Sequence, residues 1–409
     1  MKSLAILTTT IAALSAFAGE ADWPEFRGKT GQGISAATGV PQTWNATNNV
    51  AWKVAIPGKG WSSPVIAAGK IYLTTAIGEP QSGATLHALC LDAKDGKVLW
   101  NTEILKAPAG LTSAMHKKNS LASPTPIVTA DRLFVHFGHM GTAALDLTGK
   151  VIWKQTSLAY EPTHGNGGSP ALVDGLLVYS ADRAKDPELI ALDAATGAVR
   201  WKTPRDTAAQ KKFSFSTPLI TDGQIISPGS GLVGGYDVKT GKEKWRVTYG
   251  EGYSVVPRPV IADGRVFVSS SFDKPVVKAI RLDGASGDVS DTHVDWTINK
   301  GGPHTASMVI NGPHIYFVSD GGIITCAEHK TGNVLWTERI PGNYSASPVL
   351  AEGRIYFLNE TGTATVIKAG PVFQTIATNA IGEPTLASPA VIDGAIFIRS
   401  EGHLWRFGK

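Results

Sequence analysis

Apolar and polar positions alternate along this chain in a pattern that occurs eight times. A small residue and a proline usually precede a short apolar run, a polar stretch follows, and a second apolar run ends the pattern. Successive copies lie 40 to 62 residues apart, a period typical of propellers and other repeat arrays. Each copy predicts two short strands joined by a tight hairpin. The copies are SPVIAAGKIY at Pro64, TPIVTADRLF at Pro126, SPALVDGLLV at Pro170, TPLITDGQII at Pro218, RPVIADGRVF at Pro259, SMVINGPHIY at Met308, SPVLAEGRIY at Pro348 and SPAVIDGAIF at Pro389.

Most copies are followed by a second pattern, in which a small residue, an apolar residue and aspartate lead through a glycine turn to tryptophan. The aspartate is expected to accept backbone N–H bonds, and the glycine to take the positive φ that closes the turn. Each tryptophan is expected to lie between neighbouring blades, where its large ring buries much area. The seventh copy is degenerate and ends at Phe373. The predicted docking tryptophans are Trp52, Trp100, Trp153, Trp201, Trp245, Trp296 and Trp336.

Each repeat therefore predicts four short antiparallel strands, and a sheet of this size cannot bury both faces alone. Stacked radially, the sheets bury these faces against one another. After Pro389 the chain has room for only three strands, and residues 50–56 match the missing fourth strand. We therefore predict an all-β, eight-bladed propeller of four-stranded antiparallel blades over residues 49–409. Its last blade is closed by an N-terminal strand, and residues 19–48 form an extension before it.

The first 18 residues have the features of a secretion signal. Lys2 supplies a positive charge, residues 4–14 form an apolar run, and Ala16-Phe17-Ala18 is a small-x-small cleavage site. The apolar run is too short to span a bilayer, and no cysteine near the cleavage site offers a lipid anchor. These features predict an exported, periplasmic protein without a transmembrane anchor after signal cleavage.

Composition and cysteine usage fit a single propeller. The 409 residues include 45 glycines and 24 prolines, spaced as hairpins require. The formal net charge is +4 without a run of Lys or Arg, which argues against a nucleic-acid partner. Cys90 and Cys326 occupy the same repeat position and are predicted to be small buried strand residues. A disulfide needs Cα atoms within about 7 Å, and equivalent positions in blades one and six are expected to lie far apart.

The small-x-Asp-x-x-Thr-Gly-Lys-x-x-Trp phrase resembles the tryptophan-docking motif of pyrroloquinoline quinone (PQQ) dehydrogenase propellers. It is also similar to the repeats of the outer-membrane assembly scaffold BamB, and the opening DWPEFRG at residues 22–28 resembles secreted bacterial PQQ-repeat proteins. The resemblance covers nearly all of residues 23–409. It implies the propeller fold, and it implies activity only weakly, because the repeats encode packing.

The chain departs from the dehydrogenase pattern in three ways. Those enzymes carry an adjacent cysteine pair over the cofactor, and this chain has no Cys-Cys sequence. They need Ca²⁺ held by acidic and amide oxygens, and no such set can be assigned here to motif-matched positions. They also use extra chain length to cap the cofactor. We therefore expect no cofactor and no metal, with PQQ and calcium only under the dehydrogenase alternative.

Candidate binding residues lie in the loops that lead into the first strand of each blade, which converge on one mouth of the channel. Trp61, Tyr253 and Tyr344 are suited to stacking on a planar or sugar-like ring, and Arg258, His116, His164 and His304 to holding carboxylates. The alternative to a binding site is that these loops form a solvent-exposed rim, whose small residues only permit tight turns. No catalytic residue is predicted. The candidate ligand-binding residues are Trp61, His116, Asn119, His164, Asn166, Tyr253, Arg258, His304, Tyr344 and Glu383.

Three functions from different classes follow from these observations. The first is an exported, non-catalytic binding or assembly scaffold similar to BamB, with an unknown protein or cell-envelope partner and a possible small ligand in the axial pocket. The second is a quinoprotein oxidoreductase that uses the axial pocket. The third is a carbohydrate-binding module, since aromatic faces and a few polar groups can converge there.

Overall fold

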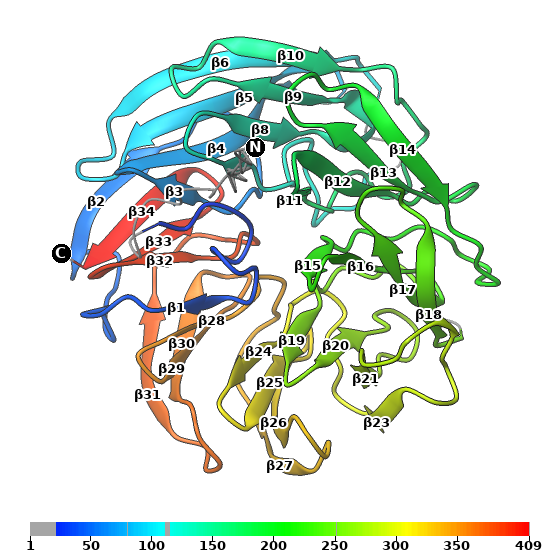
Figure 1. Cartoon of the computed structure of the whole chain (residues 1–409). Coiled ribbons are helices and arrows are strands. Elements are labelled where there is room, and N and C mark those ends of the chain that lie inside the picture. Colours follow the sequence, from blue (N-terminus) through cyan, green and yellow to red (C-terminus); the bar gives the residue numbers. More distant parts are fainter. Residues whose placement is uncertain (1–21, 80, 111–114, 251, 409) are drawn as a thin grey trace, which may run out of the picture.

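The computed structural model describes residues 22–79, 81–110, 115–250 and 252–408. Eight sheets are arranged in a ring around a central channel (Figure 1). The prediction of an all-β, eight-bladed propeller is confirmed. The described part of the chain contains a single short 3₁₀ helix, η1 (Gly138–Met140), and no helix in it is long and apolar enough to cross a membrane. The predicted signal sequence, residues 1–18, lies outside the described residues.

We number the sheets as blades 1 to 8 in chain order. In each of the first four blades, the strands follow one another from the channel outward. Blade 1 comprises β3 (Val65–Ala67), β4 (Lys70–Glu79), β5 (Gly83–Asp92) and β6 (Val98–Ala107). Blade 2 comprises β7 (Ile127–Val128), β8 (Leu133–His136), β9 (Thr142–Leu145) and β10 (Val151–Gln155). Blade 3 comprises β11 (Ala171–Val173), β12 (Leu176–Ala181), β13 (Glu188–Asp193) and β14 (Val199–Pro204). Blade 4 comprises β15 (Leu219–Thr221), β16 (Gln224–Gly229), β17 (Leu232–Asp237), β18 (Glu243–Thr248) and the added β22 (Gly287–Asp288).

The other four blades have the same antiparallel order, with two strands contributed from the N-terminal part of the chain. Blade 5 comprises β19 (Val260–Ala262), β20 (Arg265–Ser269), β21 (Val277–Arg281) and β23 (Val294–Ile298). Blade 6 comprises β24 (Val309–Asn311), β25 (His314–Val318), β26 (Ile323–Glu328) and β27 (Val334–Arg339). Blade 7 comprises β28 (Val349–Ala351), β29 (Arg354–Leu358), β30 (Thr363–Lys368), β31 (Thr375–Ala380) and, at its inner edge, β1 (Ile34–Ser35). Blade 8 comprises β32 (Ala390–Ile392), β33 (Ala395–Arg399), β34 (His403–Gly408) and, outermost, β2 (Val50–Ala55).

The hairpins between the first and second strands follow from their turn residues. Asp222 and Gly223 both have positive φ, 46° and 68°, and the equivalent pair Asp263–Gly264 has 47° and 70°. Positive φ at both central residues defines the type I′ turn, whose twist matches that of the flanking strands. We call the end of the ring that carries these turns the hairpin face. The opposite end, where loops lead into each first strand, is the mouth face.

Six of the seven predicted docking tryptophans donate their indole N–H to a carbonyl of the next blade. Trp153 Nε1 lies 3.0 Å from the Ala194 oxygen, and Trp201 Nε1 lies 3.0 Å from the Val238 oxygen. The ring covers the turn glycine, so that a Cβ added to Gly241 would lie 2.4 Å from Trp201. The aspartate turn therefore needs glycine for its positive φ of 69° and for the neighbouring indole. The other four such tryptophans are Trp52, Trp100, Trp296 and Trp336.

Two blades vary this arrangement. Trp245 donates instead to Gln224 Oε1 of its own blade, at 2.8 Å, and the insertion that precedes Trp296 supplies β22, which pairs with β18 of blade 4. Blade 7 has no tryptophan in its outer strand. There Phe373 packs edge-on against Trp336, with 5.2 Å between ring centroids. In blade 7, Phe373 thus packs against the tryptophan of the preceding blade although its own docking tryptophan is missing.

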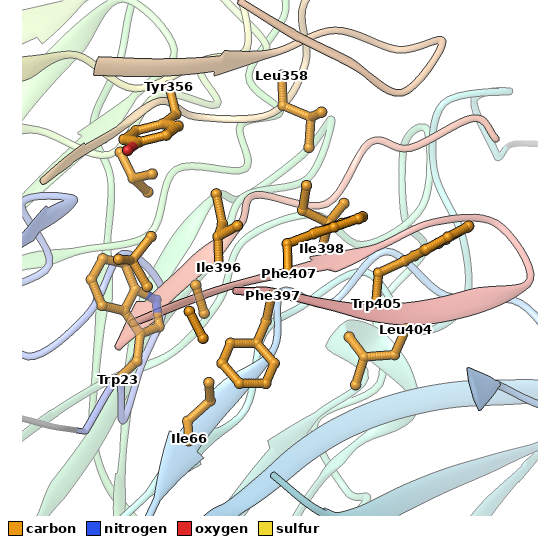
Figure 2. Close-up of a cluster of buried hydrophobic side chains, with 14 of the residues drawn as sticks. Trp23, Ile66, Tyr356, Leu358, Ile396, Phe397, Ile398, Leu404, Trp405 and Phe407 are labelled. Carbon is orange, nitrogen blue, oxygen red and sulfur yellow. The ribbon is translucent and has the colours of Figure 1, made fainter. Parts of the chain in front are cut away.

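The N-terminal segment, residues 22–49, packs into the propeller. Its Trp44 stacks on Tyr356 of β29 and Phe407 of β34, at centroid distances of 6.1 and 5.5 Å. Figure 2 shows Trp23 in the same buried cluster as Ile66, Ile396 and the Trp405–Phe407 pair of β34. The next segment, β2, is antiparallel to β34, with Val50 opposite Phe407. Cys90 and Cys326 are buried in separate clusters and unpaired, as predicted.

The N-terminal segment crosses the channel at the hairpin face, where its β1 lies beside β28 (Figure 1). It bonds to the first strand of blade 1 through Trp23 and Ile66, and to that of blade 2 through Pro24 and Val128. It also bonds to blade 8, the neighbour of blade 1, and to blades 5 and 7 farther round the ring. These contacts are Gln32–Ile261, Gly33–Leu350 and Ser35–Val391. Residues 22–35 therefore close the hairpin end of the channel, and a ligand has access from the mouth face.

Candidate functional site

A cavity of about 450 Å³ lies on the channel axis at the mouth face. Loops from all eight blades line it, because every blade directs the loop before its first strand toward the axis. Phe26 of the N-terminal segment forms its floor. Aromatic rings and hydroxyl groups dominate the lining, and its charged side chains are Lys117, Lys118 and Asp320. Two histidines, His116 and His164, also line it.

Five of the ten candidate ligand-binding residues line this cavity: Trp61, His116, Asn119, His164 and Tyr253. His116 and His164 come from neighbouring blades and their rings meet edge-on, 5.8 Å apart. Partial burial, together with the nearby charges of His164, Lys118 and Lys117, lowers the pKa of His116. The lowered pKa favours the neutral ring, which can still donate or accept a hydrogen bond, and the role of His116 in holding a carboxylate stays a prediction.

Asn166 and Arg258 are buried beside the cavity but do not line it. Asn166 donates from Nδ2 to the Phe137 oxygen at 2.8 Å, and its Oδ1 lies 3.0 Å from His139 Nδ1. Arg258 points toward the hairpin face, where it donates to the Phe26 oxygen at 2.7 Å and pairs with Glu25 at 3.2 Å. Asn166 therefore holds the loop at Phe137–His139 in place, and Arg258 supports the cavity floor at Phe26.

His304, Tyr344 and Glu383 lie outside the cavity lining. His304 stacks on Phe272 at 4.7 Å and lies 3.6 Å from Asp320. The Tyr344 ring is fully buried in the core of blades 6 and 7, where its hydroxyl donates to the Pro341 oxygen. The prediction that Tyr344 stacks on a ligand is therefore wrong, because its aromatic face is used in packing.

Glu383 lies toward the outer part of blade 8. Its carboxylate accepts the Gly402 N–H at 2.6 Å and pairs with His403 at 2.9 Å. Burial raises the pKa of this carboxyl, but the hydrogen bonds from His403 and Gly402 prevail and hold it below its usual value. Glu383 thus anchors the turn before β34 and does not reach the axial cavity.

Sequence reasoning missed an arc of aromatic rings that runs round the mouth from blade 2 to blade 6. Successive ring centroids in this aromatic arc are 4.7 to 6.0 Å apart. The residue missed entirely was Phe272, in the loop between the second and third strands of blade 5. An aromatic residue in a polar turn, SSSFDK, was the available signal. The arc consists of His116, His164, Phe213, Tyr253, Phe272 and His304.

A salt bridge joins two distant blades across the mouth. Lys118 Nζ, from the loop before blade 2, lies 2.6 Å from Glu360 Oε1 of blade 7. Glu360 also accepts a hydrogen bond from Ser345 Oγ at 2.6 Å. Both side chains are partly buried, so this pair is screened less than an exposed one. It ties the long loop of blade 2 to the opposite side of the ring.

Two buried guanidinium groups lie under the cavity floor. Arg27 donates to four backbone carbonyls, those of Gly31, Gln32, Met308 and Pro348, and has no carboxylate partner among the described residues. Burial and the nearby Arg258 lower the pKa of Arg27 to about 9, so it remains charged at neutral pH. Burial raises the pKa of Glu25, and the charge of Arg258 opposes that rise.

The cavity does not fit a calcium–PQQ centre. Ca²⁺ takes six to eight oxygen ligands, several of them usually carboxylate. Asp320 is the only carboxylate among the lining residues, and its Oδ1 already accepts bonds from the His304 N–H, the Thr305 N–H and the Thr305 hydroxyl. Across the described residues, no group of three or more His, Cys, Asp or Glu side chains is placed to hold a metal ion.

The ring of blades, the interlocking tryptophans and the axial cavity define an eight-bladed propeller of PQQ-like repeats. The family described as outer membrane protein assembly factor BamB matches residues 31–166, 142–293 and 293–371, and the chain belongs to this family.

Two groups of curated relatives share parts of the sequence. Methanol dehydrogenase [cytochrome c] subunit 1 of Paracoccus denitrificans is 32% identical over 142 residues, which are 30% of this chain and 22% of the relative. Outer membrane protein assembly factor BamB of Burkholderia pseudomallei is 27% identical over 229 residues, 54% of this chain and 49% of the relative. The chain thus spans less than half the length of either relative.

Solved structures of both groups share the fold. BamB from Moraxella catarrhalis superposes with a TM-score of 0.65 and 12% identity, over 88% of this chain and 97% of that one. A europium-containing methanol dehydrogenase superposes with a TM-score of 0.69 and 9% identity, over 96% of this chain and 98% of that one. At these identities the likeness concerns the fold alone.

Proposed function

We propose that this protein is an exported, non-catalytic propeller that acts as a binding or assembly scaffold in the cell envelope, without PQQ or a metal. The mouth face is its recognition surface. The observation that carries this proposal is the convergence of loops from all eight blades on an aromatic and basic cavity whose single carboxylate is already engaged. Membership of the BamB family and the signal-like residues 1–18 support a place in the envelope.

The chemistry of the mouth favours recognition over catalysis. General acid–base catalysis needs a titratable group with its lone pair or proton directed at the substrate. Asp320 is held by three donors from the next loop, and Lys118 is paired with Glu360. The aromatic arc, by contrast, offers a large and rigid surface, which is typical of binding sites.

Photo-crosslinking tests the scaffold role. A benzophenone side chain in place of exposed Lys117, on the mouth face, is expected to give a discrete adduct with an envelope protein in the cells that make this protein. The matched control replaces exposed Lys239 in a turn at the hairpin face. Adducts should form from position 117 and not from position 239. Equal labelling from both positions, or none from either, would remove the support for a mouth-face scaffold.

A quinoprotein oxidoreductase is the second candidate, favoured by the aromatic cavity and by the similarity to methanol dehydrogenases. After incubation with PQQ and Ca²⁺, or with PQQ and a lanthanide ion, we expect no dye-linked oxidation of methanol or ethanol above the rate without PQQ. The reason is the scarcity of carboxylate ligands in the cavity. A saturable, metal-dependent rate that Asp320→Asn abolishes would instead establish the enzyme.

A further inference from the structure

The residue just before the proline of each repeat copy, or before Met308 in the sixth copy, belongs to a hydrogen-bonded ring around the channel. In seven of the eight blades this residue is serine or threonine, two positions before the first strand, and we call these seven residues the hydroxyl crown. The backbone N–H of the residue in this position donates to the hydroxyl oxygen of the equivalent residue in the next blade, at 2.9 to 3.1 Å. The eighth position is Arg258, where the ring is interrupted. The crown consists of Ser63, Thr125, Ser169, Thr217, Ser307, Ser347 and Ser388.

The crown hydroxyls accept hydrogen bonds but do not donate them to the protein. Each oxygen accepts a backbone N–H, and no O–H of the crown has an acceptor among the described residues. None of the seven side chains is more than 6% exposed, and all except Ser307 line the axial cavity. A buried donor without an acceptor is costly. Six crown residues whose O–H groups have no acceptor among the described residues therefore line the same cavity.

We propose that the hydroxyl crown binds a small oxyanion, either a carboxylate or a phosphate-type group, at the base of the axial cavity. Its oxygen atoms accept the O–H bonds that the protein leaves unmade. Hydroxyl to anionic oxygen bonds of about 2.5–2.7 Å are among the stronger hydrogen bonds in proteins. This inference deepens the proposed function, because it names the ligand class of the cavity on which that proposal rests.

The charges around the crown favour an anion over a cation or a neutral ligand. Below it, Glu25 is the one carboxylate among the described residues that pairs with either Arg27 or Arg258, which leaves the floor with net positive charge. Arg27 donates to the Met308 oxygen and to the Pro348 oxygen, each one residue beyond a crown serine. At the mouth, the charge of Lys117 is opposed by that of Asp320 in the same lining, so the excess of positive charge lies in the floor. A cation bound to the crown oxygens would be repelled by these groups.

The bland alternative is that the crown only joins the blades, with water completing its hydrogen bonds. Threonine at position 217 tests the hydroxyl group, because valine has nearly the same shape and lacks it, whereas serine keeps it. Valine also removes the acceptor of the Ser169 N–H, so anion affinity and stability are compared in the same variant. Thr203→Val is the control, since it removes a hydroxyl that donates to the Gly241 oxygen away from the channel.

Titration calorimetry of the purified protein, at constant ionic strength set with KCl, measures the affinity for phosphate and for citrate. We expect saturable binding of at least one of them. Thr217→Val should weaken it about tenfold or more, the usual effect of losing a hydrogen bond to a charged group, whereas Thr217→Ser and Thr203→Val should leave it nearly unchanged. No saturable binding of either anion, or equal binding by Thr217→Val, would overturn the proposal.

Crystals soaked in selenate provide a test that needs no variant. An anomalous selenium peak within hydrogen-bond distance of the crown hydroxyls is expected, and selenate bound only elsewhere would refute the site. The preferred anion distinguishes carboxylate from phosphate-type ligands. An anion-binding protein without the position-117 adduct would keep this inference and remove the scaffold role. An adduct at position 117 in a protein that binds no anion would keep the scaffold role and refute the anion site.

Discussion

A protein shortened to begin at Val50 is expected to lose about 5 kcal/mol or more of unfolding free energy. The deletion removes Trp23 and Trp44, both nearly fully buried, and each large buried side chain lost from a core costs about 3–5 kcal/mol. It also removes Glu25, the ion-pair partner of Arg258, and the hydrogen bonds from Arg27 to the Met308 and Pro348 carbonyls. Urea denaturation followed by tryptophan fluorescence measures the change.

Two point variants keep this prediction testable if the shortened protein does not fold. Trp44→Ala removes the ring that stacks on Tyr356 and Phe407 and should cost about 3–5 kcal/mol. Thr30→Ala, at an exposed position of the same segment, should change stability by less than about 0.5 kcal/mol. An unchanged denaturation midpoint for the shortened protein would show that residues 22–49 do not contribute to the folded propeller.

Trp201→Ala should destabilise the propeller by about 3–5 kcal/mol. Its indole is 9% exposed and fills the space between blade 3 and the aspartate turn of blade 4, to which it donates a hydrogen bond. Alanine leaves a cavity there and an unpaired carbonyl at Val238. A loss of less than about 1 kcal/mol in urea melts would contradict the role assigned to these tryptophans.

The partner glycine of Trp201 provides the matched test. Gly241→Ala places a Cβ 2.4 Å from the indole in a backbone with φ of 69°, whereas Gly223→Ala has φ of 68° and no atom within 4 Å. The difference between the two variants isolates the clash from the backbone strain. In the Trp201→Ala background, Gly241→Ala should cost less than it does with the tryptophan present, because the ring is gone and only the contact with Thr203 Oγ1 at 2.6 Å remains. An equal loss of stability from Gly241→Ala with and without Trp201 would contradict the contact between this glycine and the indole ring.

The sequence predicted the blades well because each blade is a local structure. The landmark strands, the aspartate turns and the tryptophan positions all depend on residues within about ten positions of one another, so the period alone locates them. The N-terminal segment was predicted only as an extension. Nothing local marks Trp23 or Arg27 as buried, since their partners Ile66, Met308 and Pro348 are distant in the chain.

The candidate site was predicted only in part. Loop composition correctly placed Trp61, His164 and Tyr253 at the cavity, since loops before first strands all point to the axis. It could not separate these from Tyr344, because a tyrosine in such a loop turns inward or toward the core according to the packing of the adjacent blade. The crown was visible as a small residue at the start of seven of the eight copies, but its meaning depends on N–H groups in neighbouring blades.

What the sequence determined by itself was the repeating unit, the number of blades and the face on which variable loops gather, because periodic patterns encode strands and turns directly. The tertiary structure decided which loop residues share the cavity, that Lys118 meets Glu360 across the mouth, and that residues 22–35 close the far end. The Lys118–Glu360 pair joins groups 242 residues apart, and the Ser35–Val391 contact joins groups 356 residues apart. Ring closure brings such groups together, and no local pattern records it.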